Sequence, residues 1–206
     1  MLRLLLARHG ETDWNRERRY QGQTDVPLNE AGRRQAEALA ARLAAEPISA
    51  IYASDLARAW ATATVIAAAH GLPVRAEPRL REMCFGRFEG LTHDDIQAQY
   101  PDMFAAWQAN RDMPPEGGET MAAFAGRVGA FLDEVTRAHD DATVLLVAHG
   151  GPLRQLICPA IGLPPEARWH LAMDNAALSE LHVYREGIVL YRLNDTCHLN
   201  GTRDPR

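Results

Sequence analysis

Two apolar runs that both end in a His-Gly pair constrain the fold more than any other feature of this sequence. The first run spans residues 2–7 and leads to His9, and the second spans residues 143–148 and leads to His149. Short, continuous apolar runs are typical of strands that are buried on both faces of a parallel sheet. Ligands of open α/β sheets bind at the carboxyl ends of the strands, so we expect both histidines to face one crevice.

The remainder of the chain alternates between strand-like and helical patterns, which predicts an α/β fold with a mainly parallel, buried sheet. Ser54 follows a strand-like run directly and is expected to cap the helix after it. The expected helices cover residues 29–45, 55–70 and 119–138, and the further strands cover residues 50–53, 73–77, 178–184 and 188–193, the last two as a hairpin.

The length of 206 residues suits one sizeable hydrophobic core. No repeat or low-complexity linker interrupts the chain, so we expect a single domain over residues 1–206. A mixed segment at about residues 86–118 ends in a Pro-Pro-Glu-Gly-Gly breaker. This segment is expected to form a lid-like part of the domain that determines substrate specificity.

Composition narrows the classes of partner. A net charge of −5 gives no general reason to expect nucleic acid or an anionic membrane surface as a partner. Three widely spaced cysteines support neither a disulfide framework nor a zinc knuckle. The opening apolar run is too short for a signal-peptide core, and no stretch reaches the roughly 20 apolar residues that span a bilayer. We therefore expect a cytoplasmic protein.

Motifs around the two histidines extend over most of the chain. Residues 7–15 read Ala-Arg-His-Gly-Glu-Thr, one further residue, and Trp-Asn. Further blocks follow at residues 21–22, 25–32, 54–59, 82–90, 117–119 and 147–150. In order and spacing, these blocks resemble the histidine phosphatase superfamily, the phosphoglycerate-mutase-like proteins. The resemblance implies a three-layer α/β/α sandwich whose mainly parallel sheet carries an antiparallel edge strand.

The resemblance also implies a division of catalytic labour. His9 would be the nucleophile that forms a phosphohistidine, since a neutral imidazole is nucleophilic near pH 7 without a metal. Arg8 and Arg58 would hold the phosphoryl group with their guanidinium forks, and His149 would donate to its oxygens. Glu82 would protonate the leaving group and then activate water.

Four further residues are expected to contact the phosphate or to let the backbone approach it: Asn15, Gln21, Gly22 and Gly150. No metal site is expected, because neither a His-Glu-x-x-His motif nor a Cys/His ligand spacing occurs. No P-loop motif occurs either. We therefore expect no cofactor, and the expected partner is a small phosphorylated metabolite.

Three functions stay open: a phosphatase, a cofactor-dependent phosphoglycerate mutase, and a catalytically silent phosphate-binding regulatory module. Only 66 residues separate Glu82 from His149, which is short for a mutase insertion and favours the phosphatase. The full set of five catalytic residues argues against the silent module. A homodimer through the edge strand of the C-terminal hairpin is a further open possibility.

Resemblance is strongest to the α-ribazole phosphatases of cobalamin biosynthesis, on residues 80–89 and 163–171. Two interpretations of the residues in the lid-like segment stay open. They could line a pocket for a bulky apolar base, or they could form a small satellite core. The residues in question are Phe104, Trp107, Arg111 and Met113.

Overall fold

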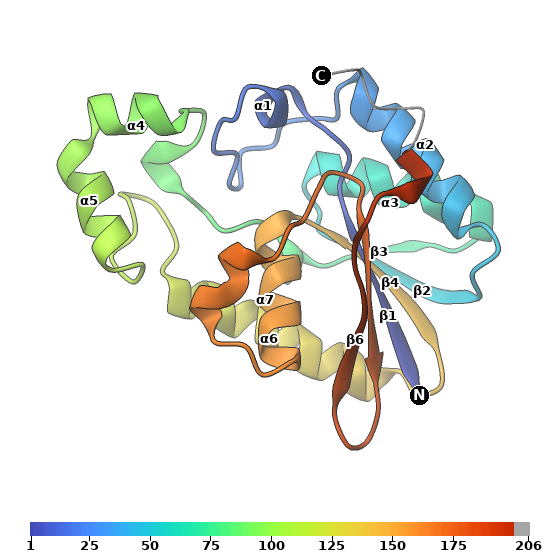
Figure 1. Ribbon diagram of the computed structural model, residues 1–206. Helices are drawn as coiled ribbons and strands as arrows, with labels where there is room; N and C mark the ends of the chain where they lie inside the picture. The colour runs from blue at the N-terminus through green and yellow to red at the C-terminus, as the bar shows by residue number, and fades with distance from the viewer. Residues whose placement is uncertain (200–206) are drawn as a thin grey trace.

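A six-stranded sheet forms the centre of the computed structural model, which describes residues 1–199 except the side chains of residues 165 and 166 (Figure 1). The strand order is β3-β2-β4-β1-β5-β6. Strands β1 to β4 pair in parallel, whereas β5 runs antiparallel to both β1 and β6. The strands are β1 (Leu2–Arg8), β2 (Ile48–Ala53), β3 (Val74–Ala76), β4 (Thr143–Ala148), β5 (Leu178–Val183) and β6 (Ile188–Asp195).

Helices cover both faces of this sheet and give the expected three-layer α/β/α sandwich. Helices α2 and α3 pack on one face, and α6 and α7 pack on the other (Figure 1). This arrangement confirms the predicted fold class, with the antiparallel pairing at one edge. The helices are α1 (Asp13–Arg16), α2 (Glu30–Leu43), α3 (Ala57–His70), α4 (His93–Gln99), α5 (Pro101–Ala109), α6 (Met121–Ala138) and α7 (Gly150–Ala160).

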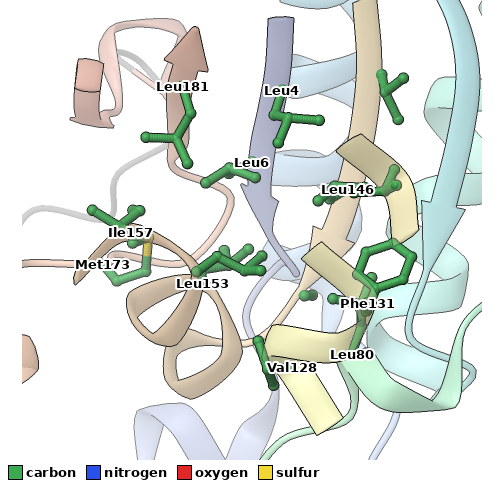
Figure 2. Packing of buried hydrophobic residues seen from close by; sticks show 14 of the residues in the cluster. Leu4, Leu6, Leu80, Val128, Phe131, Leu146, Leu153, Ile157, Met173 and Leu181 are labelled. Atoms are coloured by element: carbon green, nitrogen blue, oxygen red, sulfur yellow. The ribbon is translucent and has the colours of Figure 1, made fainter. Parts of the chain in front are cut away.

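Alternating side chains of β1 and β4 build two separate cores. Leu4 and Leu146 join the core under α6 and α7, where Phe131 and Leu153 pack against them (Figure 2). Leu5 lies on the opposite face, in the core under α2 and α3. Because both faces are covered, every residue of β4 is buried, which explains why its sequence is continuously apolar.

Residues 86–118 form a lobe beside the sandwich, built mainly from α4 and α5 (Figure 1). A small apolar cluster of its own, which includes Phe88, Ile96, Phe104 and Trp107, holds this lobe together. The segment therefore lies where a lid was predicted, although its role stays a prediction. The last seven residues of the predicted domain, 200–206, lie outside the described part of the chain.

The predicted cap of α3 is wrong. Helix α3 begins at Ala57, after Leu56 at its N-cap, rather than directly after Ser54. Asp25 supplies the missing acceptor, because its Oδ1 receives the N–H of Ala57 at 2.7 Å. The Ser54 hydroxyl instead lies 2.9 Å from Nε2 of His149. None of the helices in residues 1–199 is long and apolar enough to cross a membrane.

Candidate active site

A cleft of about 510 Å³ opens at the carboxyl ends of β1 and β4. Parallel pairing of these strands sets Arg8 opposite Ala148, so the residues that follow each strand emerge side by side. The cleft brings together all five predicted catalytic residues, which are His9, Arg8, Arg58, Glu82 and His149.

His9 is buried, with 2% of its surface exposed, and its orientation is fixed by its own loop. Its Nδ1 lies 2.6 Å from the carbonyl oxygen of Gly10. A carbonyl only accepts, so Nδ1 carries the proton and Nε2 keeps its lone pair. Burial, followed by the positive charges of Arg58 and Arg8, lowers the pKa of His9 well below 6.5. The imidazole is therefore neutral at physiological pH and has one nitrogen ready to attack.

His149 lies beside His9, with 5.0 Å between the ring centroids. Arg58 donates its Nε–H to Nδ1 of His149 at 3.2 Å, so Nε2 carries the proton and donates to Ser54. Burial, with Arg58 as the next cause, lowers the pKa of His149 well below 6.5. Both ring nitrogens thus have partners within the protein, and His149 orients Arg58. Its predicted donation to phosphoryl oxygens stays a prediction.

Arg58 is fully buried at the floor of the cleft. Besides its bond to His149, it donates to the carbonyl oxygens of Thr24 at 2.9 Å and Gly22 at 2.7 Å. Three of its five N–H groups are thereby used, and two are left for a ligand. Burial lowers the pKa of Arg58 to about 10, so the guanidinium stays charged at neutral pH.

Arg8 offers a second guanidinium, on a side chain that is half-buried. One terminal nitrogen donates to the carbonyl oxygen of Met173 at 2.5 Å, while Nε is buried without a hydrogen-bond partner. Burial lowers the pKa of Arg8 to about 10 as well. An unpaired donor on a cation in such a position is costly unless an anion binds it, so this geometry is suited to an oxyanion. That Arg8 and Arg58 bind a phosphoryl group stays a prediction.

Glu82 reaches the cleft from the segment that precedes the α4–α5 lobe. Its Oε2 accepts the N–H of Gly151 at 3.0 Å, and its Oε1 accepts the N–H of Met83 at 2.9 Å. A Cβ atom on Gly151 would lie 2.0 Å from Oε1 of Glu82, so glycine is needed here for the carboxylate to dock. The first turn of α7 thus positions the carboxylate.

The four predicted phosphate-binding residues divide into two groups. Asn15, Gln21 and Gly22 line the cleft. The Oε1 atom of Gln21 is buried without a partner, and Gly22 adopts a φ of +52° that favours glycine. Gly150 is buried and is not among the lining residues, and a Cβ there would lie 2.9 Å from a terminal nitrogen of Arg154. Its predicted role at the phosphate stays a prediction.

Glu89 lies in the motif block at residues 82–90, and its contacts give it a structural role. Its two carboxylate oxygens accept four donors from the neighbouring loops, namely the N–H groups of Gln23, Thr24 and Phe85 and the hydroxyl of Thr24. The same loop supplies the carbonyls that bind Arg58. Glu89 therefore holds in place the loop whose backbone carbonyls form the floor of the cleft.

Asn175 was not predicted, since a lone asparagine in a loop gives no sequence signal. Its Nδ2 donates to the carbonyl oxygen of His9 at 3.2 Å and to Oδ1 of Asn15 at 3.1 Å. It thereby ties the nucleophile loop to the start of α1. No group of three or more His, Cys, Asp or Glu side chains suited to a metal ion occurs within the described part of the chain.

Many known proteins are similar to this chain, among them the following three, which span nearly all of it. "Phosphoserine phosphatase 1" of Hydrogenobacter thermophilus is 38% identical over 200 residues, covering 97% of this chain and 95% of that protein. "Probable phosphoglycerate mutase GpmB" of Yersinia enterocolitica is 39% identical over 211 residues, covering 97% of this chain and 96% of that protein. The crystal structure of the α-ribazole phosphatase from Shigella flexneri superposes with a TM-score of 0.88 at 33% identity, covering 94% and 96%.

The family comparison agrees with the geometry. The sequence pattern of the histidine phosphatase superfamily (branch 1) matches residues 4–196. Relatives and structural neighbours named as phosphatases, together with this match, support an enzyme of the phosphatase type. The chain belongs to branch 1 of the histidine phosphatase superfamily.

Proposed function

We propose that the protein hydrolyses a small organic phosphomonoester through a phosphohistidine at Nε2 of His9. One observation carries the proposal: the unprotonated Nε2 of His9 lies in a cleft with two guanidinium groups that keep unused donors, one on the buried Arg58 and one on the half-buried Arg8. Phosphoryl transfer requires a nucleophile and an anion receptor, and these groups are suited to the two roles.

The reaction runs in two displacements at phosphorus. Nε2 of His9 attacks, the ester P–O bond breaks, and Glu82 gives its proton to the departing alkoxide. Water then attacks the phosphohistidine, Glu82 takes the water proton, and the N–P bond breaks to release phosphate and free His9. Arg8 and Arg58 offset the charge on the phosphoryl oxygens throughout.

Hydrolysis is favoured over mutase activity by the short distance in sequence between Glu82 and His149, 66 residues. The relative named as a mutase keeps phosphoglycerate mutase as the second candidate. An assay with 2-phosphoglycerate and 2,3-bisphosphoglycerate distinguishes phosphatase activity from mutase activity. Release of phosphate faster than isomerisation supports the phosphatase, and the reverse order supports the mutase.

α-Ribazole 5′-phosphate is the first substrate to test, because sequence resemblance and a solved structure both lead to an α-ribazole phosphatase. Phosphoserine is the second, because of the relative named as a phosphoserine phosphatase. The α4–α5 lobe contributes Phe104, Trp107 and Arg111 to the cleft and is proposed as the segment that selects between such esters. A panel of both esters with sugar phosphates would rank them by kcat/KM.

The decisive experiment compares wild type with His9→Ala on p-nitrophenyl phosphate in the presence of EDTA. We expect hydrolysis by wild type and a loss of at least a thousandfold in the variant, since no other group can replace the nucleophile. His70→Ala is a suitable control, because His70 lies at the far end of α3. Equal rates for wild type and His9→Ala would refute the enzyme and leave the silent binding module.

A further inference from the structure

A tight turn that precedes β5 is hydrogen-bonded to the loop that carries His9. The turn is closed by the N–H of Ala177, which donates to the carbonyl oxygen of Asp174 at 3.1 Å. The N–H of Ala176 donates to the carbonyl oxygen of His9 at 3.0 Å, and the N–H of Arg8 donates to the carbonyl oxygen of Ala177 at 3.2 Å. The turn therefore contacts the backbone of two residues that the proposed reaction uses.

The backbone of this turn is strained at one residue. Ala176 is fully buried and has a φ of +54°, in the left-handed region that favours glycine. That conformation costs about 1–2 kcal/mol for a residue with a Cβ atom. Strained residues tend to gather at functional sites, where the surrounding contacts hold them. Here the strained residue directly follows Asn175, whose side chain lies against the loop that carries His9.

The loop determines which way the side-chain amide of Asn175 is turned. Its Nδ2 lies 3.2 Å from the carbonyl oxygen of His9 and 3.4 Å from that of Gly10. Carbonyl oxygens only accept, so the amide presents its NH₂ group to the loop. The carbonyl oxygen of Gly10 also accepts the Nδ1–H of His9 at 2.6 Å. Asn175 is thus bonded to the peptide groups that orient the imidazole.

Asn175 in turn determines the orientation of Asn15. Oδ1 of Asn15 accepts from Nδ2 of Asn175 and from the N–H of Thr12, both at 3.1 Å. Because both partners are donors, the oxygen of the Asn15 amide faces them and its nitrogen faces away. Asn15 lines the cleft, and its Nδ2 has no hydrogen-bond partner among the residues that the structure describes. Both hydrogens of this nitrogen are available to a ligand.

We propose that Asn175 is a positioning residue that acts through Asn15. By occupying Oδ1, it holds the NH₂ group of Asn15 towards the phosphoryl group of the bound ester. Without Asn175 the amide of Asn15 is free to rotate, and a carbonyl oxygen turned towards phosphoryl oxygens would repel them. A donor that is oriented before the ester binds needs no reorganisation during the reaction. This inference rests on the proposed function, because it requires a phosphoryl group beside His9.

The test is a double-mutant cycle of Asn175→Leu with Asn15→Ala. Leucine keeps nearly the shape of asparagine but has no donor, and Asn175→Ala is the alternative if leucine disturbs folding. Two quantities are measured in every variant: kcat/KM for p-nitrophenyl phosphate, and the Kd of inorganic phosphate by calorimetry. Ser49→Ala is the matched control. It also removes one side-chain hydrogen bond to the backbone, from Ser49 to Thr143, at the opposite end of the sheet.

In the wild-type background we expect Asn175→Leu to lower kcat/KM roughly ten- to a hundredfold and to weaken phosphate binding about fivefold. In the Asn15→Ala background both losses should be at least threefold smaller, because the amide that Asn175 orients is gone. Ser49→Ala should change neither quantity. Losses that differ by less than threefold between the two backgrounds, or no loss in wild type, would overturn the proposal. A merely structural role predicts that first result.

Phosphate binding requires no turnover, so this proposal and the proposed function fail separately. If His9→Ala is inactive and the cycle shows no coupling, the phosphatase stands and the role of Asn175 is refuted. If His9→Ala is as active as wild type, the phosphatase is refuted. The coupling in phosphate affinity then still shows whether Asn175 acts through Asn15.

Discussion

Replacing Gly151 with alanine tests whether the docking of Glu82 limits the reaction. Gly151 lies in the first turn of α7, and its N–H donates to Oε2 of Glu82 at 3.0 Å. A Cβ atom there would lie 2.0 Å from Oε1 of Glu82, whereas ordinary contacts begin at about 3.4 Å. The carboxylate must therefore move by about 1.4 Å.

The size of the effect follows from that displacement. A well-placed general acid is worth about 10²–10⁴ in rate, and a shift of about 1 Å in a catalytic group costs about 10². We therefore expect kcat for an alkyl phosphate to fall about a hundredfold. The atom that must move belongs to the far end of a flexible side chain, and alanine suits a helix better than glycine. Stability should change by less than about 1 kcal/mol.

The assay compares two leaving groups and one trapped intermediate. p-Nitrophenolate leaves without a proton, so its ester should lose less activity than an alkyl phosphate such as phosphoserine. Rapid quenching with radiolabelled substrate should show phosphohistidine forming on His9 more slowly. Gly129→Ala is the matched control, because no atom lies within 4 Å of its Cβ position in α6.

Three results would refute the reasoning. Unchanged kcat on both esters would show that the docked position of Glu82 does not matter. An equal loss on both esters would show that Glu82 does not act as the acid. A large drop in the urea midpoint of Gly151→Ala, absent in Gly129→Ala, would show that the clash is relieved by the backbone instead.

Three other perturbations test other parts of the site. The pKa of His9 is held below 6.5 in the folded protein, so the unfolded chain takes up a proton first as the pH falls. The free energy of unfolding should therefore decrease below about pH 6.5, by up to ~1.4 kcal/mol per pH unit. Urea unfolding between pH 8 and pH 5 should show a smaller loss of stability in His9→Asn than in wild type. The same dependence of stability on pH in both proteins would contradict the lowered pKa of His9. Glu89→Gln should loosen the loop that binds Arg58 and lower kcat/KM about tenfold, while unaltered kinetics would argue against that role. Gly32→Ala puts a Cβ 2.0 Å from the carbonyl oxygen of Glu11 and should cost about 1–3 kcal/mol in urea unfolding, whereas wild-type stability would mean that the backbone relaxes freely.

The strands that carry His9 and His149 were predictable because burial on both faces leaves an unbroken apolar run. The cap of α3 was not, although Ser54 stands in a typical capping position. Its hydroxyl lies 2.9 Å from His149, a residue 95 positions away, and local sequence carries no sign of that contact. Tertiary contacts here overrule a local preference.

The lid-like segment shows a different limit of sequence reasoning. Apolar residues there predicted either a ligand pocket or a satellite core, and Trp107 belongs to both. Met113, in the same segment, is 57% exposed and does not line the cleft. Arg111 forms no ion pair with any residue in the described part of the chain, and this was not predictable either. Whether an arginine is paired depends on where carboxylates such as Asp112 lie in three dimensions.

The place of β1 in the sheet has a consequence for synthesis on the ribosome. This first strand is hydrogen-bonded on one side to β4 and on the other to β5. Both partner strands begin more than 130 positions after the end of β1, so they are translated much later. Until about residue 183 has left the exit tunnel, a nascent chain exposes apolar β1 with at least one edge unpaired. The cleft therefore assembles late, and chaperones that shield strand edges should engage nascent chains until about the first nine tenths of the sequence has emerged.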